Sequence, residues 1–444
     1  MSTRDGAMAR RLAVIGAGYV GLTVAACFAH LGHRVSCIEC DEAKARALAA
    51  GRVPMAEPGL QPLWRRHLED GTLTVHCEAA EGLPGAEVVF LCVGTPSSPD
   101  GAADLGQVWR AAAELARAMP RGARAVLAVK STVPPGTTHH LSVMMRGLRP
   151  DLHLPVVANP EFLREGRAVQ DFLSPPRIVL GADDEEAART LAELYRPLDA
   201  PVVHCRPISA ELAKYACNAF LAARVSFVNE IAELAEALGA DIGEVTAVMG
   251  LDPRIGPAYL EAGLGWGGSC LPKDLRALIA LARGLGVPSP VLEGIAQTNA
   301  RQVARTVARL ASVAGPLEGK RVALWGLAFK PGCDDTRDSP ALALGRALQE
   351  AGAEVTAYDP VASCTEFAVH RDPYRAVEAA DAAVVATGWP ELRSLDWARV
   401  RSLMKRPLVL DARNALDGEA VRAAGLVYMA LGRPLVGEPA PVEG

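Results

Sequence analysis

Hydrophobic and polar positions follow two patterns along the chain. Short apolar runs that end at a glycine, a proline or a polar turn are typical of buried strands, and longer stretches with helical spacing separate them. In the amino-terminal half the strand-like runs cover 11–16, 34–39, 87–93, 125–130 and 155–159, and a helix is expected over 22–31. This alternation predicts an α/β fold, a parallel sheet with helices on both faces.

The residue composition of the chain changes near Ser209. Residues 210–238 contain neither Gly nor Pro and are mostly good helix formers, which predicts a helix of roughly 40 Å, unbroken or broken into two. A second helical region is expected over 291–314, and a strand, helix and strand follow over 320–326, 339–351 and 353–359. We therefore expect two Rossmann-like, doubly wound parallel-sheet domains (1–205 and 315–444) joined by a central helical region (206–314).

The first strand runs into the glycine turn Gly16-Ala-Gly-Tyr-Val-Gly21. Between a strand and a helix, this spacing is typical of a dinucleotide-binding turn. Gly16 makes the tight turn, Gly18 admits the pyrophosphate, and Gly21 allows close helix–strand packing. A lone G-x-G-x-x-G is also found in ordinary loops, but here both flanking strands and a following acid are in register.

That acid is Glu39, at the end of the second strand. Its carboxylate would accept hydrogen bonds from a ribose hydroxyl and repel a 2′-phosphate, which favours NAD over NADP. Arg34 and Lys44 nearby would work against this preference.

A possible nucleophile lies in 263–274, Gly-Leu-Gly-Trp-Gly-Gly-Ser-Cys-Leu-Pro-Lys-Asp. Pro272 suits a first helical turn, so Cys270 would precede a helix whose dipole favours the thiolate. Asp274 would share its helix face, and the glycines would let backbone N–H groups approach a phosphate or a sugar hydroxyl. The alternative is a buried cysteine beside a flexible loop.

Polar turns follow three of the predicted strands. Ligands of open α/β sheets bind at the carboxyl ends of the strands, so Thr95, Thr132 and Glu161 are expected around one crevice. Lys214 and Asn218 would share one face of the long helix, and the spacing alone does not decide between a functional pair and a solvated stripe.

Composition narrows the class of protein. The chain has 444 residues and a net charge of −5, so nothing in its charge favours nucleic acid. No apolar core lies within residues 1–10 and no apolar run would span a bilayer, so we expect a cytoplasmic protein with no membrane partner. The ten cysteines are scattered, and Cys37 and Cys40 are expected to be packing residues. No metal site is expected.

Taken together, these residues resemble the UDP-glucose/GDP-mannose dehydrogenase family from about Arg11 to about Leu431. The motifs that carry the likeness are Gly16-Ala-Gly-Tyr-Val-Gly21, Ser131-Thr-Val-Pro-Pro-Gly136, Asn159-Pro-Glu-Phe-Leu-Arg-Glu-Gly166, Glu211-Leu-Ala-Lys-Tyr-Ala-Cys-Asn218, Gly267-Gly-Ser-Cys-Leu-Pro-Lys-Asp274 and Gly326-Leu-Ala-Phe-Lys330. The resemblance implies a homodimer formed through the central helix. It also implies NAD-dependent, four-electron oxidation of a nucleotide-diphosphate hexose at C6, with UDP-glucose to UDP-glucuronate favoured.

The resemblance also implies residue roles. The catalytic residues would be Cys270, Lys214, Asp274, Glu161, Thr132 and Asn218. Cofactor contacts would come from Gly16, Gly18, Tyr19, Val20, Gly21, Glu39, Lys44, Gly94, Thr95, Pro96, Ser131, Thr132, Glu165, Lys273 and Arg337. Substrate contacts would come from Glu161, Phe162, Leu163, Arg164, Glu165, Lys214, Asn218, Arg254, Tyr259, Leu260, Gly263, Gly265, Gly267, Phe329, Lys330 and Arg413. Arg254 would reach the substrate of the neighbouring subunit, and a short helix from Pro160 would present Glu161 and Glu165 together.

Three alternatives stay open at this point. The same reaction could act on dTDP-glucose or GDP-mannose. A two-electron β-hydroxyacid dehydrogenase shares the Rossmann domain and long helices but would not need Cys270. A sugar-nucleotide sensor would keep the binding sites, yet it would not need Cys270, Lys214 or Asp274.

Overall fold

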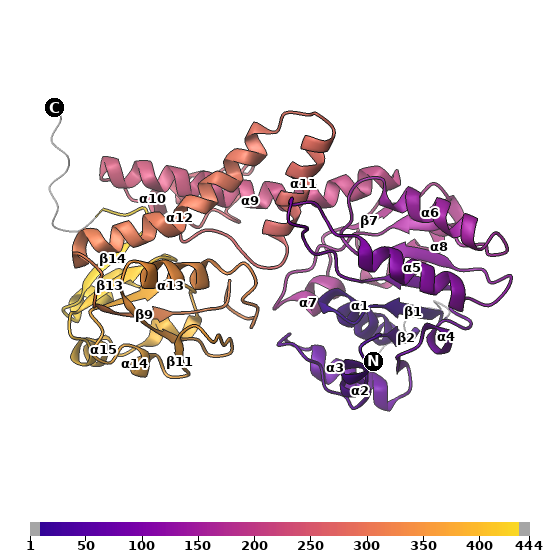
Figure 1. Cartoon of the computed structure of the whole chain (residues 1–444), viewed down its shortest axis with the longest axis horizontal. Coiled ribbons are helices and arrows are strands. Elements are labelled where there is room, and N and C mark those ends of the chain that lie inside the picture. Colours follow the sequence, from indigo (N-terminus) through magenta and orange to yellow (C-terminus); the bar gives the residue numbers. More distant parts are fainter. Residues whose placement is uncertain (1–8, 435–444) are drawn as a thin grey trace. The chain divides into compact units, whose positions relative to one another are not determined.

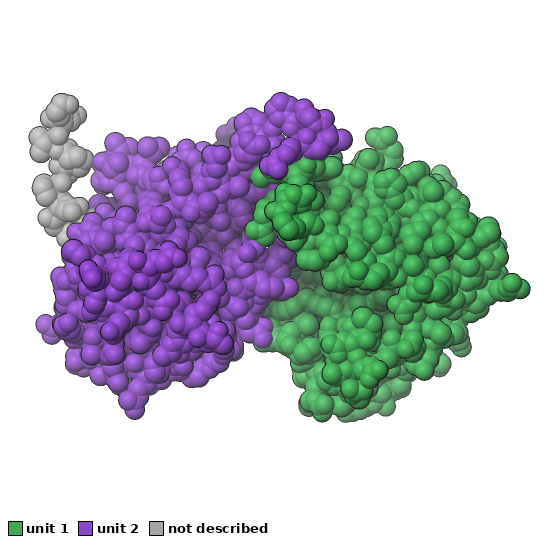
Figure 2. All heavy atoms as spheres, viewed as in Figure 1, with its two compact units in different colours: residues 1–217, 276–281 green, residues 218–275, 282–444 purple. Residues whose placement is uncertain are grey.

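The computed structural model describes residues 9–434, so most of the segment 1–10, where no secretory signal is expected, lies outside the described residues. The chain forms two compact units, residues 1–217 with 276–281 and residues 218–275 with 282–444 (Figure 2). The division into 1–205, 206–314 and 315–444 stays a prediction. Among the described residues, no helix combines the length and apolarity needed to cross a membrane.

The first unit contains an eight-stranded sheet with the order β3-β2-β1-β4-β5-β6-β7-β8 (Figure 1). Its strands are β1 (Arg11–Ile15), β2 (Arg34–Ile38), β3 (Leu73–His76), β4 (Val88–Leu91), β5 (Val126–Val129), β6 (Val156–Ala158), β7 (Ile178–Gly181) and β8 (Val202–Cys205). All neighbouring strands pair in parallel except β6 and β7, which are antiparallel. The five predicted strand runs in this half of the chain are confirmed.

Helices cover both faces of this sheet (Figure 1). They are α1 (Tyr19–His30), α2 (Glu42–Ala49), α3 (Leu60–Glu69), α4 (Ala79–Gly82), α5 (Gly106–Ala118), α6 (Thr137–Leu148), α7 (Ala168–Leu173) and α8 (Glu185–Tyr195), with the 3-10 turn η1 (Arg196–Leu198). Because side chains alternate along a strand, Leu12 and Val14 of β1 pack into the core that contains α1. Ala13 and Ile15 pack into the core that contains α5 and α6.

The predicted long helix is confirmed as α9 (Pro207–Leu238), unbroken over 32 residues. It is followed by α10 (Ile242–Leu251), α11 (Leu271–Gly284) and α12 (Pro290–Ala314). Large apolar side chains are exposed on α9, among them Leu212, Phe220, Phe227, Leu234 and Leu238. Their helical spacing places them in one stripe along the helix.

The second unit contains a six-stranded parallel sheet with the order β11-β10-β9-β12-β13-β14. Its strands are β9 (Arg321–Trp325), β10 (Glu354–Tyr358), β11 (Ala368–His370), β12 (Ala382–Val385), β13 (Leu408–Asp411) and β14 (Val427–Ala430). Its helical elements are α13 (Pro340–Glu350), α14 (Pro373–Ala376), η2 (Pro390–Ser394), α15 (Trp397–Leu403) and α16 (Gly418–Ala423). The prediction of a second Rossmann-like sheet is therefore confirmed.

Candidate active site

The glycine turn has the geometry that a dinucleotide needs. Gly16 has a φ of +94°, which L side chains rarely adopt. A Cβ at Gly21 would lie 1.8 Å from the Gly16 carbonyl oxygen, so glycine is required where α1 packs on β1. A Cβ at Gly18 would meet no atom within 4 Å, which leaves open space before the amino end of α1. The residues present therefore fit a bound pyrophosphate.

Glu39 is buried at the carboxyl end of β2, as expected. One carboxylate oxygen accepts from the Ala17 N–H at 3.3 Å and lies 2.8 Å from Lys44 Nζ. Burial alone would raise the pKa of the Glu39 carboxyl, but the Lys44 ammonium and backbone N–H donors hold it below its ordinary value. Lys44 thus pairs with the acid that is expected to bind ribose.

Two interpretations from this region are wrong. Arg34 does not lie near Glu39, because it begins β2 and Glu39 follows the end of the same strand. Cys40 is exposed and only Cys37 is a buried packing residue. Two residues three apart at a strand end point to different sides, and one of those sides is solvent here. None of the ten cysteines forms a disulfide.

The expected helix from Pro160 is absent. Residues 160–164 form no regular structure and α7 begins at Ala168. The carboxylate of Glu161 folds back to accept the Leu163 N–H at 2.6 Å, and Arg164 is held by Asp171 at 2.6 Å. These local bonds replace the helical ones, so Glu161 and Glu165 are not presented one turn apart.

Tyr19 is hydrogen-bonded at the amino end of α1, and its expected contact with the cofactor stays a prediction. Its hydroxyl donates to the Glu57 carboxylate at 2.6 Å and accepts from the Gly166 N–H at 3.1 Å. Glu57 is buried and accepts the N–H groups of Gly166 and Ala168 at 2.7 Å each. The amino end of α1 is thereby tied to the loop that contains Glu161. Val20 is half-buried beside Tyr19.

The turns after β4 and β5 meet, as the sheet order predicts. The Thr95 hydroxyl donates to the Thr132 carbonyl at 2.8 Å, and the Ser131 hydroxyl donates to the Val93 carbonyl at 2.7 Å. Gly94 lies against the amide of Gln107, and Pro96 continues the turn. Because β6 is the next strand after β5, the Glu161 loop follows at the same edge of the sheet.

Glu161 and Lys214 form a buried ion pair. Lys214 Nζ lies 2.9 Å from a Glu161 carboxylate oxygen, and both side chains are less than a tenth exposed. Lys214 Nζ also lies 5.3 Å from the centre of the Phe162 ring. Burial would raise the pKa of Glu161, but the charge of Lys214 outweighs it, so the carboxyl pKa is lowered. Lys214 and Asn218 are both buried, which excludes a solvated stripe.

Cys270 lies immediately before α11, and Pro272 is in the first turn of that helix, as predicted. The Asp274 N–H donates to the Cys270 carbonyl at 2.9 Å. The Cys270 Sγ lies 3.5 Å from the Ser269 Oγ. Asp274 is buried and accepts from the Asn218 amide at 2.6 Å. Lys273 Nζ lies 2.5 Å from the other Asp274 oxygen. A thiol, a carboxylate, an amide and an ammonium therefore surround the start of α11.

The glycines before Cys270 are closely packed against other segments, and their expected approach to a ligand stays a prediction. A Cβ at Gly263 would lie 2.7 Å from the Ala412 carbonyl, and one at Gly267 would lie 2.2 Å from the Asp338 carbonyl. A Cβ at Gly268 would meet the Phe329 ring at 2.7 Å. Gly265 has a φ of +101°. The loop before Cys270 therefore packs closely against the carboxy-terminal sheet, where only glycine fits.

Arg413 is hydrogen-bonded to the same loop. Its guanidinium donates to the carbonyls of Ala386 and Gly265, each at 2.7 Å. Burial lowers the pKa of Arg413 to about 10, and its Nη2 is buried without a hydrogen-bond partner among the described residues. A buried donor without a partner is costly, so Nη2 suits an anionic or carbonyl group of a ligand.

The remaining expected contacts stay predictions, and the structure places their side chains as follows. Lys330 Nζ lies 5.3 Å from the centre of the Phe329 ring. Arg337 pairs with Asp335 at 2.7 Å, and the largely exposed Arg254 pairs with Asp252 at 2.6 Å. Tyr259 has a φ of +61°. Leu260 beside it is buried.

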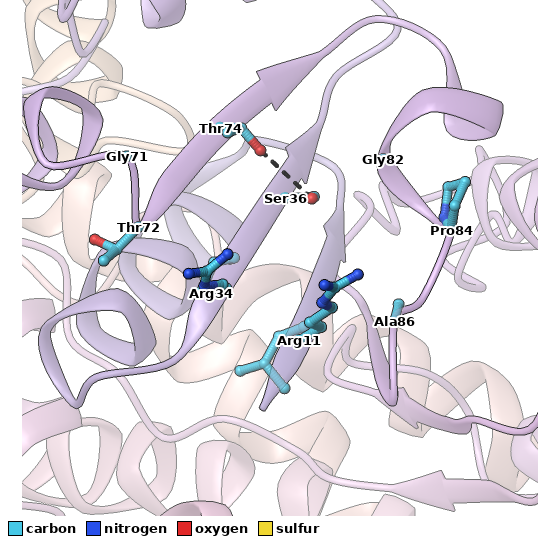
Figure 3. Close-up of a pocket in the computed structure, with 11 residues that line it drawn as sticks. Arg11, Arg34, Ser36, Gly71, Thr72, Thr74, Gly82, Pro84 and Ala86 are labelled. Carbon is cyan, nitrogen blue, oxygen red and sulfur yellow. Dashed lines mark hydrogen bonds between the residues drawn. The ribbon is translucent and has the colours of Figure 1, made fainter. Parts of the chain in front are cut away.

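A separate hollow of about 290 Å³ lies in the first unit (Figure 3). Arg11, Arg34, Ser36, Thr72 and Thr74 line it at the amino ends of β1, β2 and β3. The glycine turn follows the opposite, carboxyl end of β1. The hollow is therefore not part of the dinucleotide site.

Besides Glu57, two buried charged residues were not among the site residues expected from the sequence. Lys130 contacts the Asn159 side chain at 3.2 Å. Glu211 accepts the Gly136 and Thr138 N–H groups at 2.6 and 2.7 Å and so holds the start of α6. Each of these residues directly flanks or lies within a quoted motif, and that is the signal that could have singled them out.

Comparisons with known proteins agree with this geometry. The chain matches the NAD binding domain, the central domain and the UDP binding domain of the UDP-glucose/GDP-mannose dehydrogenase family over residues 10–199, 208–301 and 323–418. It is 43% identical to a UDP-glucose 6-dehydrogenase of Pseudomonas aeruginosa (96% of this chain, 98% of the relative). It is 40% identical to one of Bacillus subtilis (96% and 94%).

Among solved structures, a UDP-glucose dehydrogenase from Pyrobaculum islandicum matches with a TM-score of 0.91 and 38% identity over 98% of this chain and 100% of that chain. The match extends over both sheets and the long helix between them. With a dinucleotide turn that fits NAD and a thiol, carboxylate and amide at the start of α11, the chain belongs to the UDP-glucose/GDP-mannose dehydrogenase family of NAD-dependent oxidoreductases.

Proposed function

We propose that this protein oxidises UDP-glucose to UDP-glucuronate, a four-electron oxidation at C6 that consumes two NAD⁺. The observation that carries the proposal is Cys270 at the start of α11, with Asp274 and Asn218 joined by a 2.6 Å hydrogen bond one turn away. The full-length similarity to UDP-glucose 6-dehydrogenases supports this choice of substrate.

The reaction needs a nucleophile because an aldehyde has no hydroxyl from which a second hydride can leave. NAD⁺ held at the Gly16–Gly21 turn would supply the hydride acceptor for each oxidation. After the first oxidation, the Cys270 thiolate adds to the aldehyde carbon, and the carbonyl oxygen takes a proton to give a thiohemiacetal. Loss of a second hydride and of the hydroxyl proton leaves a thioester. Water then cleaves the carbon–sulfur bond, which releases the carboxylate and regenerates the thiol.

We assign roles to the other groups from the family resemblance and from their charges. The Lys214 ammonium and the Asn218 amide, one turn apart on α9, stabilise negative charge on the reacting oxygen. Asp274 and Thr132 bind the water and relay protons. Glu161, held ionised by Lys214, acts as the base in the thioester steps. Arg413 Nη2 and Lys330 contact the sugar nucleotide.

We also propose a homodimer built on the apolar stripe of α9. Phe220 and Phe227 are 64% and 54% exposed, and such surface on a long helix favours association. Arg224 donates to the Ile255 and Gly256 carbonyls at 2.7 Å each and so fixes the loop that presents Arg254. The exposed Arg254 then completes the substrate pocket of the partner.

The test is an assay of UDP-glucose, dTDP-glucose and GDP-mannose, each with NAD⁺. UDP-glucose should give two NADH per sugar nucleotide and a uronic acid, both quantified on the same sample. A ratio of one with free aldehyde, or turnover of another sugar nucleotide alone, would refute the proposal. Binding without NADH formation would instead indicate a sensor.

A further inference from the structure

A second buried ammonium lies beside the ion pair of Glu161 and Lys214. Lys130 follows the last residue of β5 and is 6% exposed. Its Nζ donates to the Asn159 side-chain oxygen and to the Tyr195 hydroxyl, each at 3.2 Å. None of the proposed chemical steps uses Lys130, although burying a lysine is costly unless the ammonium serves a partner.

The contacts of Lys130 fix the start of the Glu161 loop. Asn159 follows β6, the strand that neighbours β5, and its amide donates to the Val179 carbonyl at 3.0 Å. The Tyr195 hydroxyl donates to the same Asn159 oxygen at 2.6 Å. Asn159 is therefore held from three directions, two residues before Glu161.

A small cavity of about 40 Å³ lies in this region, large enough for a water molecule. Lys130, Asn159, Glu161 and Tyr195 are among its lining residues. The ammonium and the carboxylate thus line the same cavity, whose other lining side chains are mostly apolar. Here each charge acts on the other more strongly than it would in bulk water.

The charges around Glu161 are mostly positive. The titratable or charged groups that face it or line the same cavity are Lys214 of α9, Lys130 after β5, Cys92 after β4, Asp171 of α7, Arg177 before β7 and Tyr195 of α8. Asp171 is paired with Arg164. Burial lowers the pKa of Lys130 to about 8, so the ammonium is mostly charged at neutral pH. Besides Lys214, Lys130 contributes to the lowered pKa of Glu161.

We propose that Lys130 is a positioning residue for Glu161: through Asn159 it holds the Glu161 loop, and its charge helps to keep the carboxylate ionised. The inference rests on the proposed function, in which Glu161 acts as a base. Lys130 itself touches no reacting atom.

Two neutral variants test this. Lys130→Gln removes the charge but keeps a donor for Asn159, and Lys130→Met removes both. In each variant, the acidic limb of the pH profile of kcat/KM for UDP-glucose should move to higher pH. A shift of about one pH unit is equivalent to activity about tenfold below that of the parent on this limb. Lys130→Arg should return the acidic limb to its parental pH. Tyr195→Phe keeps the ammonium and should not move the limb.

NAD affinity and thermal unfolding distinguish an effect on Glu161 from a general structural effect. Both should stay near the parental values in Lys130→Gln. An unshifted limb in both neutral variants would overturn the inference. So would loss of NAD binding and of cooperative unfolding in both, because Lys130 would then hold the fold and not Glu161.

A readout without turnover separates this inference from the proposed function. Carbon-13 NMR of labelled glutamate carboxyls, with Glu161→Gln to assign the signal, should show a higher Glu161 pKa in Lys130→Gln than in the parent. If the parent makes no uronic acid, the proposed function fails. If the NMR signal does not move between parent and variant, the assignment of Lys130 fails.

Discussion

Replacing Glu39 by alanine should change the cofactor preference in two ways at once. The carboxylate that is expected to bind the ribose is lost, so NAD binds less tightly. Lys44, whose Nζ lies 2.8 Å from that carboxylate, also loses its partner. A cation then lies where a 2′-phosphate would be bound.

The size of each effect follows from the contacts. A hydrogen bond to a charged group contributes about 1.5–3 kcal/mol, so kcat/KM for NAD should fall roughly 10- to 150-fold. Removing the repulsion and exposing Lys44 should raise kcat/KM for NADP about tenfold, because the partly exposed ammonium is screened by water. The NAD/NADP ratio should therefore fall by roughly two to three orders of magnitude.

The assay is initial-rate kinetics with both cofactors at saturating sugar nucleotide and low ionic strength. The double variant Glu39→Ala/Lys44→Met is the matched control, and it should keep the loss with NAD but not the gain with NADP. Thermal unfolding checks that the Ala17 N–H, which loses its acceptor, does not destabilise the fold. A parent enzyme that already prefers NADP, or a ratio unchanged by Glu39→Ala, would refute the reasoning.

Four further outcomes are expected. Cys270→Ser should lower uronic-acid formation more than about a hundredfold while equilibrium dialysis still shows NAD and UDP-glucose binding, and near-parental acid yield would identify another nucleophile. Arg254→Ala should weaken UDP-glucose binding but not NAD binding, and mixing it with Cys270→Ser should restore activity only if the arginine crosses the dimer interface. Phe227→Asp should produce monomers in sedimentation velocity, and a persistent dimer would exclude the α9 stripe as the interface. Gly268→Ala should cost about 1–3 kcal/mol in denaturant unfolding, because its Cβ would meet the Phe329 ring at 2.7 Å, and an unchanged midpoint would contradict the packing role.

The elements that the sequence predicts well have strong local signals. A buried apolar strand that runs into Gly16, and the Gly- and Pro-free stretch that forms α9, are determined by backbone freedom and side-chain periodicity. The position of Cys270 before α11 follows from Pro272 in the same way. The meeting of Thr95 and Thr132 follows from strand order alone.

Features that depend on particular side-chain hydrogen bonds or on packing between distant segments could not be predicted from the apolar pattern. The Glu161 loop is not helical because Leu163 and Asp171 supply competing hydrogen bonds. The glycines before Cys270 are required by carbonyls and a ring far along the chain, from Phe329 to Ala412, which no local pattern indicates. Lys130 was passed over because a lysine at a strand end is ordinarily solvated.

The burial of Asp359 affects how the reaction velocity should depend on the NAD concentration. Asp359 follows β10 as Glu39 follows β2. Unlike Glu39 it is fully buried, and its carboxylate accepts the N–H groups of Leu327 and Ala328 at 2.8 and 3.1 Å and that of the Trp389 ring at 3.1 Å. No acceptor is left there for a ribose, so the second sheet domain cannot hold a dinucleotide in the pose of the first. Raising the NAD concentration should therefore saturate the enzyme without displacing the sugar nucleotide, and velocity should reach a plateau with no inhibition by excess cofactor.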